Sequence, residues 1–344
     1  MEKVALVVTS ISSPNQVLQV LARGCVKHGW DFIVAGDILS PKNFQLDGCA
    51  YYDIDRQMGT DFLVSRKCLT GHYARKNVGY LIAIKKGADI IVETDDDNLP
   101  QESFWQQRKQ VREARFINGK GWVNVYSYFS DDFIWPRGFP LNLIRKKTDI
   151  RQELLSLRKL KCPIQQGLAN NNPDVDAVYR LVMPLPINFK GSDDIALGPQ
   201  VWSPFNSQNT TWWPEAFPLL YLPSYCSFRM TDIYRSLVAQ RIAWENGWSV
   251  LFHRPTVSQE RNQHNLMKDF ADEMSGYIQV ETIGQILEQI NIKPGVKLIP
   301  DAMRQCYGRL VAKSIFDVKE LDVLEAWLKD LDGLSLDLCP EATD

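Results

Sequence analysis

The sequence predicts an α/β protein whose mainly parallel sheet is flanked by helices and followed by a helical tail. The first part of the chain alternates short, apolar, β-branched runs with helical patterns, as in Val4–Ser10 followed by Gln16–His28. Strands this apolar have no side suited to water, which indicates a parallel sheet covered by helices on both faces. Near the carboxyl end, Asp301–Leu331 shows the apolar period of two amphipathic helices.

The elements up to the fourth strand follow from local signals. Val17, Leu18 and Leu21 share one face of the first helix, and Gly87 is a stop signal for the second. In chain order we expect strands at Val4–Ser10, Asp31–Ala35, Cys49–Asp53 and Ala88–Glu93, and helices at Gln16–His28 and Tyr73–Lys86. Because parallel sheets bind ligands beyond the carboxyl ends of their strands, we expect the functional site at that edge.

The pattern loosens after Gln101. We expect a helix at Glu102–Arg115, a strand at Gly121–Tyr128, ordered functional loops at Trp135–Pro140 and Pro184–Pro223, and helices at Thr231–Asn246 and Ile283–Ile290. The two tail helices should separate near Ser314. Because the sequence has no internal repeat and no flexible linker, we expect one domain over residues 1–300 and a helical tail over residues 301–344 packed on it.

Composition narrows the class of protein. The 344 residues include 39 Lys+Arg and 41 Asp+Glu, which gives a net charge of −2, and 45% of them are hydrophobic. These values are typical of a globular protein and argue against disorder and against a nucleic-acid partner. No apolar run approaches the ~20 residues that span a bilayer, and the start of the chain does not resemble a secretory signal. We therefore expect no transmembrane segment, whereas a peripheral membrane contact stays open.

Cysteine and histidine usage indicates a reducing compartment. The seven cysteines are scattered and include no C-x-x-C pair, so a disulfide framework and a structural zinc site are both poor interpretations. Buried thiols in a reducing cytoplasm explain them better, and we expect a cytoplasmic protein. The four histidines leave little supply for a multi-histidine metal centre.

Three successive carboxylates, Asp95, Asp96 and Asp97, follow the apolar strand Ala88–Glu93. Like charges ~4 Å apart repel by about 1 kcal/mol in water and by about 4 at an effective dielectric of 20, so the cluster favours a neutralising cation. Mg²⁺ or Mn²⁺ would accept these oxygen ligands and leave positions for phosphates. In an extended segment Asp95 and Asp97 point the same way and could hold the ion, while Asp96 meets a sugar or a basic side chain. The alternative is a solvated acidic turn.

Other polar residues converge on the same predicted edge. Arg75 and Lys76 begin the helix that leads into the fourth strand, and two cations near an acidic cluster could bind a diphosphate. Thr9 and Ser10 end the first strand and Asp37 follows the second, where these side chains could contact a nucleotide. Thr9, Ser10 and Asp37 alone are more often simple turn residues, and Arg75 and Lys76 could equally be a solvated helix start, so the weight of these residues comes from convergence.

At these residues the chain resembles a known family. The stretch Val8–Asp97 is similar to the catalytic region of the STELLO glycosyltransferases of the plant Golgi, which is of the GT-A type. The similarity continues, in order, at Trp135–Leu141, Ile164–Ala169, Pro173–Val178, Pro204–Thr210 and Met230–Arg235. Weaker similarity extends to the reversibly glycosylated polypeptides, which are plant nucleotide-sugar mutases with an Asp-Asp-Asp run and a segment like Arg137–Pro140.

The resemblance implies a GT-A-like catalytic domain, a nucleotide-sugar donor, and Mn²⁺ or Mg²⁺ bound at Asp95 and Asp97. Ser258 stands where the family has a histidine. If that histidine is a metal ligand in relatives, another residue must replace it here or the ion is held more openly. The possible replacements are His253, Glu260 and His264, of which His264 is our candidate ligand.

Two further departures concern the chemistry and the membrane. The mutases carry a sugar-accepting arginine shortly after their Arg-Gly-aromatic-Pro segment, but Ile144 stands at that place here and Arg145 one step away. This difference argues against mutase chemistry. The sequence also shows no amino-terminal membrane anchor of the kind that the plant enzymes have.

Sugar transfer needs a group that helps the acceptor hydroxyl lose its proton. Asp232, at the start of the predicted helix Thr231–Asn246, is our candidate for this catalytic role. The alternative is that an acid in the first turn only caps the helix. Candidate sugar or acceptor contacts are Arg137, Asp193, Asp194 and Asn209, and an aromatic sugar platform could include Trp202, Trp212, Trp213 and Tyr221.

The sequence therefore predicts a metal-dependent glycosyltransferase that moves a sugar from a nucleotide-sugar donor to a glycan or another hydroxyl acceptor. Two alternatives stay open: a nucleotide-sugar mutase, and a non-catalytic sugar-binding or scaffold protein of the same fold.

Overall fold

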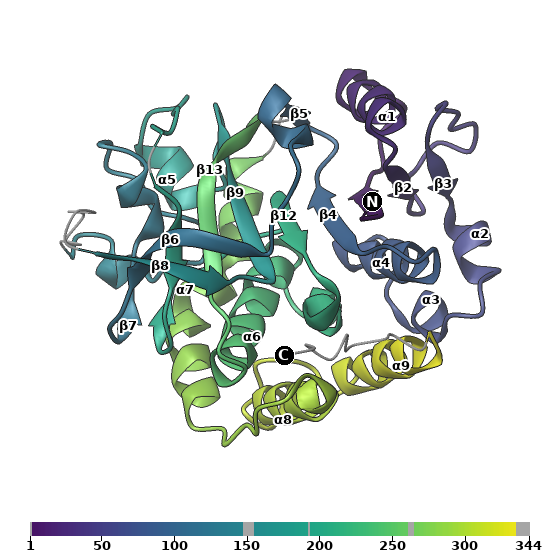
Figure 1. Ribbon diagram of the computed structural model, residues 1–344. Coiled ribbons are helices and arrows are strands. Elements are labelled where there is room, and N and C mark those ends of the chain that lie inside the picture. Colours follow the sequence, from purple (N-terminus) through teal and green to yellow (C-terminus); the bar gives the residue numbers. More distant parts are fainter. Residues whose placement is uncertain (1, 147–154, 192, 261–264, 335–344) are drawn as a thin grey trace, which may run out of the picture.

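The computed structural model describes residues 2–146, 155–191, 193–260 and 265–334. In these residues a sheet of 11 strands runs through the molecule with helices on both sides (Figure 1). Ten strands follow each other in the order β3-β2-β1-β4-β12-β9-β13-β10-β6-β8, and β5 pairs with β13. The predicted α/β fold, with its central sheet, flanking helices and helical carboxyl-terminal region, is confirmed.

The amino-terminal part of the sheet is entirely parallel. It contains β1 (Val4–Thr9), β2 (Asp31–Ala35), β3 (Ala50–Tyr52) and β4 (Ile90–Thr94). These strands pair in parallel, with β1 between β2 and β4. Helix α1 (Gln16–His28) packs on one face of the sheet and α4 (Lys76–Lys85) on the other. The carboxyl ends of β1, β2 and β4 consequently meet at one edge.

Strand β12 (Asn209–Trp212) joins this parallel part to the rest of the sheet. It runs antiparallel to β4 and to β9, so that Asn209 lies opposite Thr94. The remaining strands are β5 (Asn98–Pro100), β6 (Val111–Ile117), β8 (Ser156–Lys161), β9 (Ile164–Asn170), β10 (Ile195–Leu197) and β13 (Val250–Gln259). A small second sheet pairs β7 (Gly121–Trp122) with β11 (Val201–Trp202). The antiparallel β12 brings the segment that precedes it to the end of β4.

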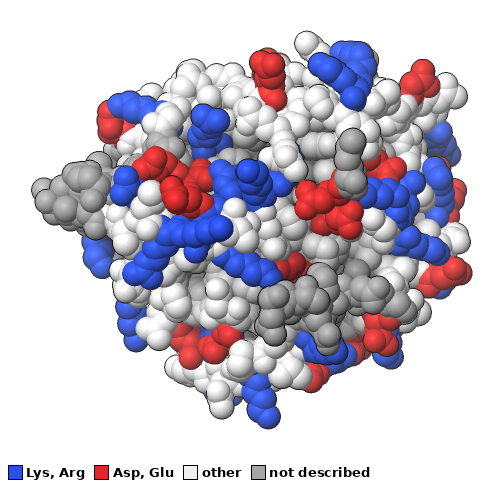
Figure 2. Space-filling view, in the orientation of Figure 1, with Lys and Arg blue, Asp and Glu red and all other residues white. Residues whose placement is uncertain are grey.

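Strand β8 is the outermost strand on the far side of the sheet. Arg158, Lys159 and Lys161 project from it, and Figure 2 shows Lys and Arg side chains gathered over β6 and β8. Charged side chains on an edge strand discourage pairing with another chain. This basic surface therefore has a structural explanation and lies away from the carboxyl ends of β1, β2 and β4.

Helices cover the sheet and close one side of the molecule. Besides α1 and α4 they are α2 (Ile54–Met58), α3 (Leu63–Lys67), α5 (Ala177–Val182), α6 (Thr231–Glu245), α7 (Leu266–Glu288), α8 (Ile299–Ala312) and α9 (Glu320–Gly333). In the described parts of the chain, none of the helices combines the length and the apolar content needed to cross a membrane.

The two predicted tail helices are present as α8 and α9, and the chain turns between them at Ser314 with a φ of 57°. Helix α9 is tied back to the amino-terminal part: the Asp330 carboxylate accepts hydrogen bonds from the backbone N–H groups of Leu63 and Val64, each at 2.8 Å. Trp327 is fully buried and its indole Nε1 donates to the Pro218 carbonyl at 2.9 Å. The division into domains at residue 300 stays a prediction.

Four of the predicted elements differ from the structure. The strand predicted at Gly121–Tyr128 is only β7, followed by the 3₁₀ turn η3 (Val125–Tyr128). The segment Pro184–Pro223, predicted as a loop, contains the short strands β10, β11 and β12.

The segment predicted as a helix at Glu102–Arg115 forms a short 3₁₀ turn, η2 (Glu102–Trp105), followed by β6. In β6 Ala114 and Phe116 are buried on one face, because β6 pairs with β8 and β10, and these tertiary contacts override the helical propensity. The helix predicted at Ile283–Ile290 is only the end of the longer α7, whose earlier buried positions include two acids and hide the apolar period.

A buried ion pair connects four elements around the end of β4. Both side chains are almost completely inaccessible: Glu93 on β4 is 0% exposed and Arg235 on α6 is 1% exposed. The Arg235 guanidinium donates to both Glu93 oxygens, at 2.8 and 3.0 Å. The same carboxylate accepts from the Trp212 indole of β12 at 2.8 Å and from the Tyr80 hydroxyl of α4. This network fixes β4 relative to α6, the two elements that carry the candidate site.

We predict that Glu93→Gln lowers the free energy of unfolding by about 3–5 kcal/mol, because the Arg235 charge would stay buried without its partner. Urea unfolding measures this change. Glu325→Gln is the control: Glu325 pairs with Arg304 on the surface, where both side chains are more than 40% exposed, and loss of such a pair costs less than about 1 kcal/mol. Similar losses in the two variants would contradict the prediction.

A second prediction concerns Glu320 at the start of α9. Burial raises the pKa of this carboxyl to about 7, although it accepts hydrogen bonds from the Tyr221 hydroxyl and from the backbone of Ser224 and Tyr225. Because the pKa of Glu320 is raised in the folded state, its contribution to the free energy of unfolding is fully present below about pH 4.5. That contribution is lost as the pH rises through about 7.

We therefore measure the free energy of unfolding of wild type and of Glu320→Gln at pH 4 and at pH 8. Relative to the variant, wild type should lose roughly 3 kcal/mol of this free energy between the two pH values. The difference isolates Glu320, because all other titrating groups are common to the two proteins. A difference that does not change with pH would rule this account out.

Candidate functional site

Two adjoining pockets lie at the carboxyl ends of β1, β2 and β4. The outer pocket has a volume of about 330 Å³. The residues that line this pocket and not its neighbour are Thr9, Ser10, Ile11, Asp37, Leu39, Gly71, His72, Asp96 and Asp97. The structure thus brings four of the predicted donor-binding residues, Thr9, Ser10, Asp37 and Asp96, to one pocket, together with the predicted metal ligand Asp97.

The inner pocket is smaller, about 100 Å³, and is lined by polar side chains. Residues found only there are Arg137, Asp174, Arg180, Ser207, Gln208 and Asp232. Five residues line both pockets and mark the junction between them: Tyr73, Asp95, Phe228, Arg229 and Gln259. A ligand that extends through this junction would contact both the acidic cluster and Asp232.

The carboxylates after β4 have different partners. Asp95 accepts a hydrogen bond from the Tyr73 hydroxyl at 2.6 Å and lies 3.3 Å from the Lys76 ammonium. Asp96 accepts a hydrogen bond from the Ser10 hydroxyl. Asp97 accepts from the Gln259 amide, which lies 3.1 Å from both carboxylate oxygens. The cluster is therefore organised by hydrogen bonds, and in the part of the chain that the structure describes only Asp95 has a lysine ammonium nearby.

Negative charge in this cluster is incompletely balanced. Burial, followed by the Asp95 and Asp96 charges, raises the pKa of Asp97 to about 7. Burial also raises the pKa of Asp95, against the opposing effect of Lys76. Carboxylates that repel each other in a partly dry pocket are a suitable environment for a cation.

The donor set suits a hard divalent ion. Asp95 and Asp97 offer carboxylate oxygens only, which Mg²⁺ and Mn²⁺ prefer, and such ions commonly take their other ligands from water and substrate phosphates. Within the described ranges, no group of three or more His, Cys, Asp or Glu side chains is arranged to hold an ion. The predicted ligand His264 lies outside the described residues, and the two alternatives, His253 and Glu260, line neither pocket.

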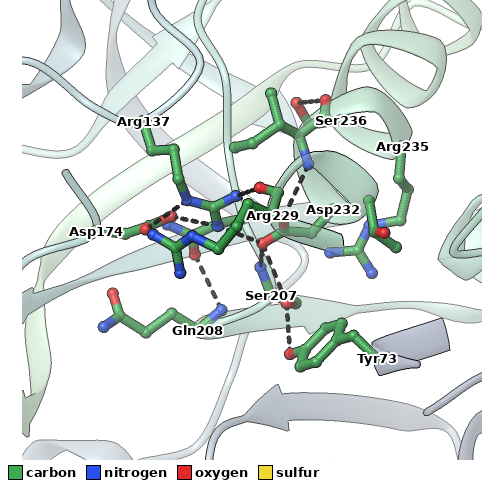
Figure 3. Close-up of polar contacts among 12 residues, drawn as sticks. Tyr73, Arg137, Asp174, Ser207, Gln208, Arg229, Asp232, Arg235 and Ser236 are labelled. Carbon is green, nitrogen blue, oxygen red and sulfur yellow. Dashed lines mark hydrogen bonds and ion pairs between the residues drawn. The ribbon is translucent and has the colours of Figure 1, made fainter. Parts of the chain in front are cut away.

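Asp232 is held at the wall of the inner pocket by Arg137 (Figure 3). The Arg137 guanidinium spans two carboxylates, with distances of 2.9 and 3.0 Å to the Asp232 oxygens and 2.8 and 2.9 Å to the Asp174 oxygens. Ser207 adds its backbone N–H to Asp232 at 3.2 Å. Burial alone would raise the pKa of Asp232, but the Arg137 charge and its hydrogen bonds reverse this effect and lower the pKa below its usual value. Asp232 is consequently ionised and a weak base.

Asp37 organises the rim of the outer pocket. Its carboxylate accepts hydrogen bonds from the backbone N–H groups of Gly71 and His72, each at 2.8 Å. The bonds hold the segment before α4 against the end of β2. Gly71 has a φ of 64°, a conformation that side chains of L-residues rarely adopt. At the neighbouring strand end, the Thr9 hydroxyl donates to the Ala35 carbonyl at 2.8 Å.

The two cations predicted to bind a diphosphate point into the protein. Arg75 is 0% exposed, lines neither pocket, and donates to Gln57 and to the carbonyls of Ser65 and Cys68. Lys76 is also 0% exposed. Its ammonium is surrounded by oxygen acceptors from Tyr73, Thr94, Asp95 and Ser207. Arg75 therefore has an evident structural role, and Lys76 acts on the pocket only through Asp95 and Tyr73.

Other predicted contacts lie away from the two pockets. Asp193 and Asp194 pair with Arg115 and Arg112 beside β6. Asn209 is buried within the sheet, where its amide donates to the Leu168 carbonyl at 3.1 Å and to the Thr256 hydroxyl at 2.9 Å. The four aromatic residues considered as a sugar platform are buried in the core: Trp202, Trp212, Trp213 and Tyr221. The structure gives all of these residues packing or pairing roles.

Several pocket residues were not singled out by sequence reasoning. Asp174 and Asp232 both accept hydrogen bonds from Arg137. The sequence signal that could have identified Asp174 is its place in the family-like segment Pro173–Val178. Gln259, next to the departure at Ser258, is the residue of β13 that reaches Asp97. Phe228 and Arg229 gave no signal, because they precede α6 in a short turn whose position depends on the folded chain.

We predict that Arg137→Met lowers the free energy of unfolding by about 3–5 kcal/mol, because Asp174 and Asp232 would be left buried without a cation. Chemical denaturation measures the loss. The matched control is the triple variant Arg137→Met, Asp174→Asn, Asp232→Asn, which removes all three charges and should recover most of the stability. If the single variant loses less than about 1 kcal/mol, the contacts of Arg137 with Asp174 and Asp232 do not hold the pocket together.

Comparison with known proteins places this site in a family context. Residues 229–341 match the family model of the STELLO glycosyltransferases. The chain is 30% identical over 297 residues to the probable glycosyltransferase STELLO2 of Arabidopsis thaliana, an alignment that covers 80% of this chain and 38% of that protein. The probable glycosyltransferase STELLO1 of the same plant is 29% identical over 273 residues, which cover 73% of this chain and 35% of that protein.

The chain thus spans less than half the length of these curated relatives. Among solved structures, a mycobacterial protein matches with a TM-score of 0.40 and 9% identity, over 81% of this chain and 74% of that chain, which is too distant to inform the site. The family match begins at Arg229 and includes Asp232. The resemblance to the STELLO glycosyltransferases that the sequence motifs predicted is therefore confirmed, and it extends over most of the chain.

Proposed function

We propose that this protein transfers a sugar from a nucleotide-sugar donor to a hydroxyl group of a glycan or another acceptor. The observation that carries the proposal is the junction of the two pockets at Asp95. There Asp95, the first carboxylate of the acidic cluster after β4, lines both pockets, while Asp96 and Asp97 line the outer one. A further carboxylate, Asp232, which is ionised, lines the inner pocket. Donor and acceptor need such adjoining spaces, because a bond must form between them.

We propose that Asp95 and Asp97 hold Mg²⁺ or Mn²⁺. When bound, the ion would neutralise negative charge on the departing diphosphate. Asp96 accepts a hydrogen bond from the Ser10 hydroxyl and is not among the proposed ligands. Gln259 orients the Asp97 carboxylate, and Tyr73 and Lys76 orient that of Asp95.

In our proposal the nucleoside lies in the outer pocket. The side chains of Ile11 and Leu39 are 54% and 70% exposed and offer it apolar surface. The Thr9 and Ser10 hydroxyls already donate to the Ala35 carbonyl and to Asp96, so toward a ligand they can only accept hydrogen bonds. The rim held by Asp37 gives this pocket a fixed shape, so that little ordering is needed when a donor binds.

The inner pocket would hold the transferred sugar and the acceptor hydroxyl. During transfer the bond between the sugar carbon and the diphosphate breaks, a bond to the acceptor oxygen forms, and the acceptor loses its proton. Asp232 stays our candidate for the group that accepts a hydrogen bond from this hydroxyl. Because Arg137 lowers the pKa of Asp232, the carboxylate is a weak base, so we expect the proton to move only as the new bond forms.

Sugar transfer is consistent with the names of the curated relatives, which are probable glycosyltransferases. The cytoplasmic location inferred from cysteine usage stays a prediction.

The proposal is tested by measuring hydrolysis of a panel of nucleotide sugars with and without Mn²⁺. We expect Asp97→Asn to reduce Mn²⁺-dependent hydrolysis of the best donor by at least about 100-fold, since loss of an ion that stabilises a leaving group costs several kcal/mol. Asp301→Asn, which changes an exposed carboxylate on α8, is the control and should behave like wild type. Thermal unfolding shows whether each variant is folded.

Other outcomes favour other functions. If Asp97→Asn hydrolyses the donor as fast as wild type does, the proposed ion site is contradicted. Radiolabelled sugar retained covalently on the protein would favour a mutase. Binding of donors without any turnover, in the presence of acceptor sugars and Mn²⁺, would favour a sugar-binding scaffold.

A further inference from the structure

The junction between the pockets lies beside negative charge. A diphosphate placed there would lie beside Asp95, Asp96 and Asp97 and would repel them. The cations that the sequence suggested for this role, Arg75 and Lys76, are both 0% exposed and already surrounded by protein acceptors. The ion proposed at Asp95 and Asp97 would offset part of this repulsion, and a protein cation that donates hydrogen bonds to the phosphate oxygens would offset more of it.

Arg229 occupies a position suited to this role. It belongs to the turn η7 (Phe228–Met230), which precedes α6, and it lines the outer and the inner pocket. Among the lysines and arginines of the described residues, no other side chain lines both pockets. Figure 3 shows it next to the cluster formed by Arg137, Asp174 and Asp232.

The Arg229 guanidinium is held in place from the side away from the pockets. Its Nε and Nη2 donate to the same Glu273 oxygen of α7, at 3.0 and 2.7 Å. Glu273 is 0% exposed, and its other oxygen accepts from the Ala177 backbone at 2.7 Å and from the Tyr277 hydroxyl at 2.6 Å. Within the described residues Nη1 of Arg229 makes no hydrogen bond. The side chain therefore has a fixed position and an available donor group.

Phe228 adds an apolar cover to the junction. It is 50% exposed, and its ring lies edge-on to those of His72 and Tyr73, with centroids 5.7 and 6.0 Å apart. An aromatic side chain beside Arg229 places apolar surface on one side of the junction. A charge-assisted hydrogen bond from a guanidinium is stronger where water is excluded.

We propose that Arg229 binds the diphosphate of the donor at the junction of the two pockets, with its guanidinium positioned by Glu273. This inference rests on the proposed function and identifies the residue that recognises the diphosphate. Arginine suits the task because its planar fork can donate two hydrogen bonds to phosphate oxygens.

Calorimetric binding of nucleoside diphosphates tests the inference on the full chain. UDP, GDP and ADP are titrated in the presence of Mn²⁺, and the diphosphate that binds most tightly is compared with its own nucleoside. We expect Arg229→Gln to weaken diphosphate binding by roughly 10- to 100-fold, the range that loss of a hydrogen bond to a charged group implies. Binding of the nucleoside alone should change by less than about twofold, because the outer pocket stays intact.

Two further variants guard against a folding defect. Arg229→Gln with Glu273→Gln removes the guanidinium together with the carboxylate that holds it and should show the same selective loss, although Asp269, 3.9 Å from Nε of Arg229, keeps its charge. Arg229→Lys keeps the charge and should lose less affinity. Arg304→Gln on α8 is the control for the loss of a positive charge and should bind like wild type.

The outcomes separate this inference from the proposed function. Suppose that wild type binds a nucleoside diphosphate and that Arg229→Gln, alone or with Glu273→Gln, binds it equally well. Arg229 then does not recognise the diphosphate, although the proposed function stands. Equal losses for the nucleoside and the diphosphate would also overturn the inference, since they would indicate a damaged pocket. If wild type binds none of the three diphosphates, the proposed function fails and the inference with it.

Discussion

The geometry of the site depends on the buried pair between Glu93 and Arg235. Glu93 is two residues before the acidic cluster, and Arg235 is one helical turn after Asp232. By joining the end of β4 to the first turns of α6, the pair sets the separation of the two groups of carboxylates that line the pockets. Burying a charged pair is costly, and here hydrogen bonds from Trp212 and Tyr80 compensate part of that cost. The pair therefore contributes a fixed arrangement of elements more than it contributes net stability.

The same principle of paired charge recurs around both pockets. Arg137 spans Asp174 and Asp232, and Glu273 holds Arg229, so that most buried charges have a partner within the protein. The acidic cluster differs from this pattern. Lys76 reaches Asp95, but among the described residues the only side-chain partner of the Asp97 carboxylate is the neutral Gln259 amide, and the pKa of Asp97 is raised. An uncompensated carboxylate beside a compensated one is the arrangement expected where a ligand supplies the missing charge.

Much of the fold could be predicted because its signals are local. The bounds of α1 agree with the prediction from its amphipathic face, and the strand before Asp95 was recognised from its apolar run. The prediction at Glu102–Arg115 was wrong because β6 derives its alternation from pairing with distant strands. The site shows the same division. The cluster at Asp95–Asp97 is contiguous and was recognisable, whereas the direction of the Arg75 side chain and the position of Arg229 depend on residues far apart in the chain. Sequence alone shows which residue types are present, but not which partners they satisfy.

The most direct test of the account is the anomalous scattering of manganese in crystals grown with Mn²⁺ and a nucleoside diphosphate. The account predicts a manganese peak at the carboxylates of Asp95 and Asp97, with the diphosphate at the junction of the two pockets. A nucleotide bound in the outer pocket without manganese at these carboxylates, or manganese bound elsewhere on the protein, would contradict it.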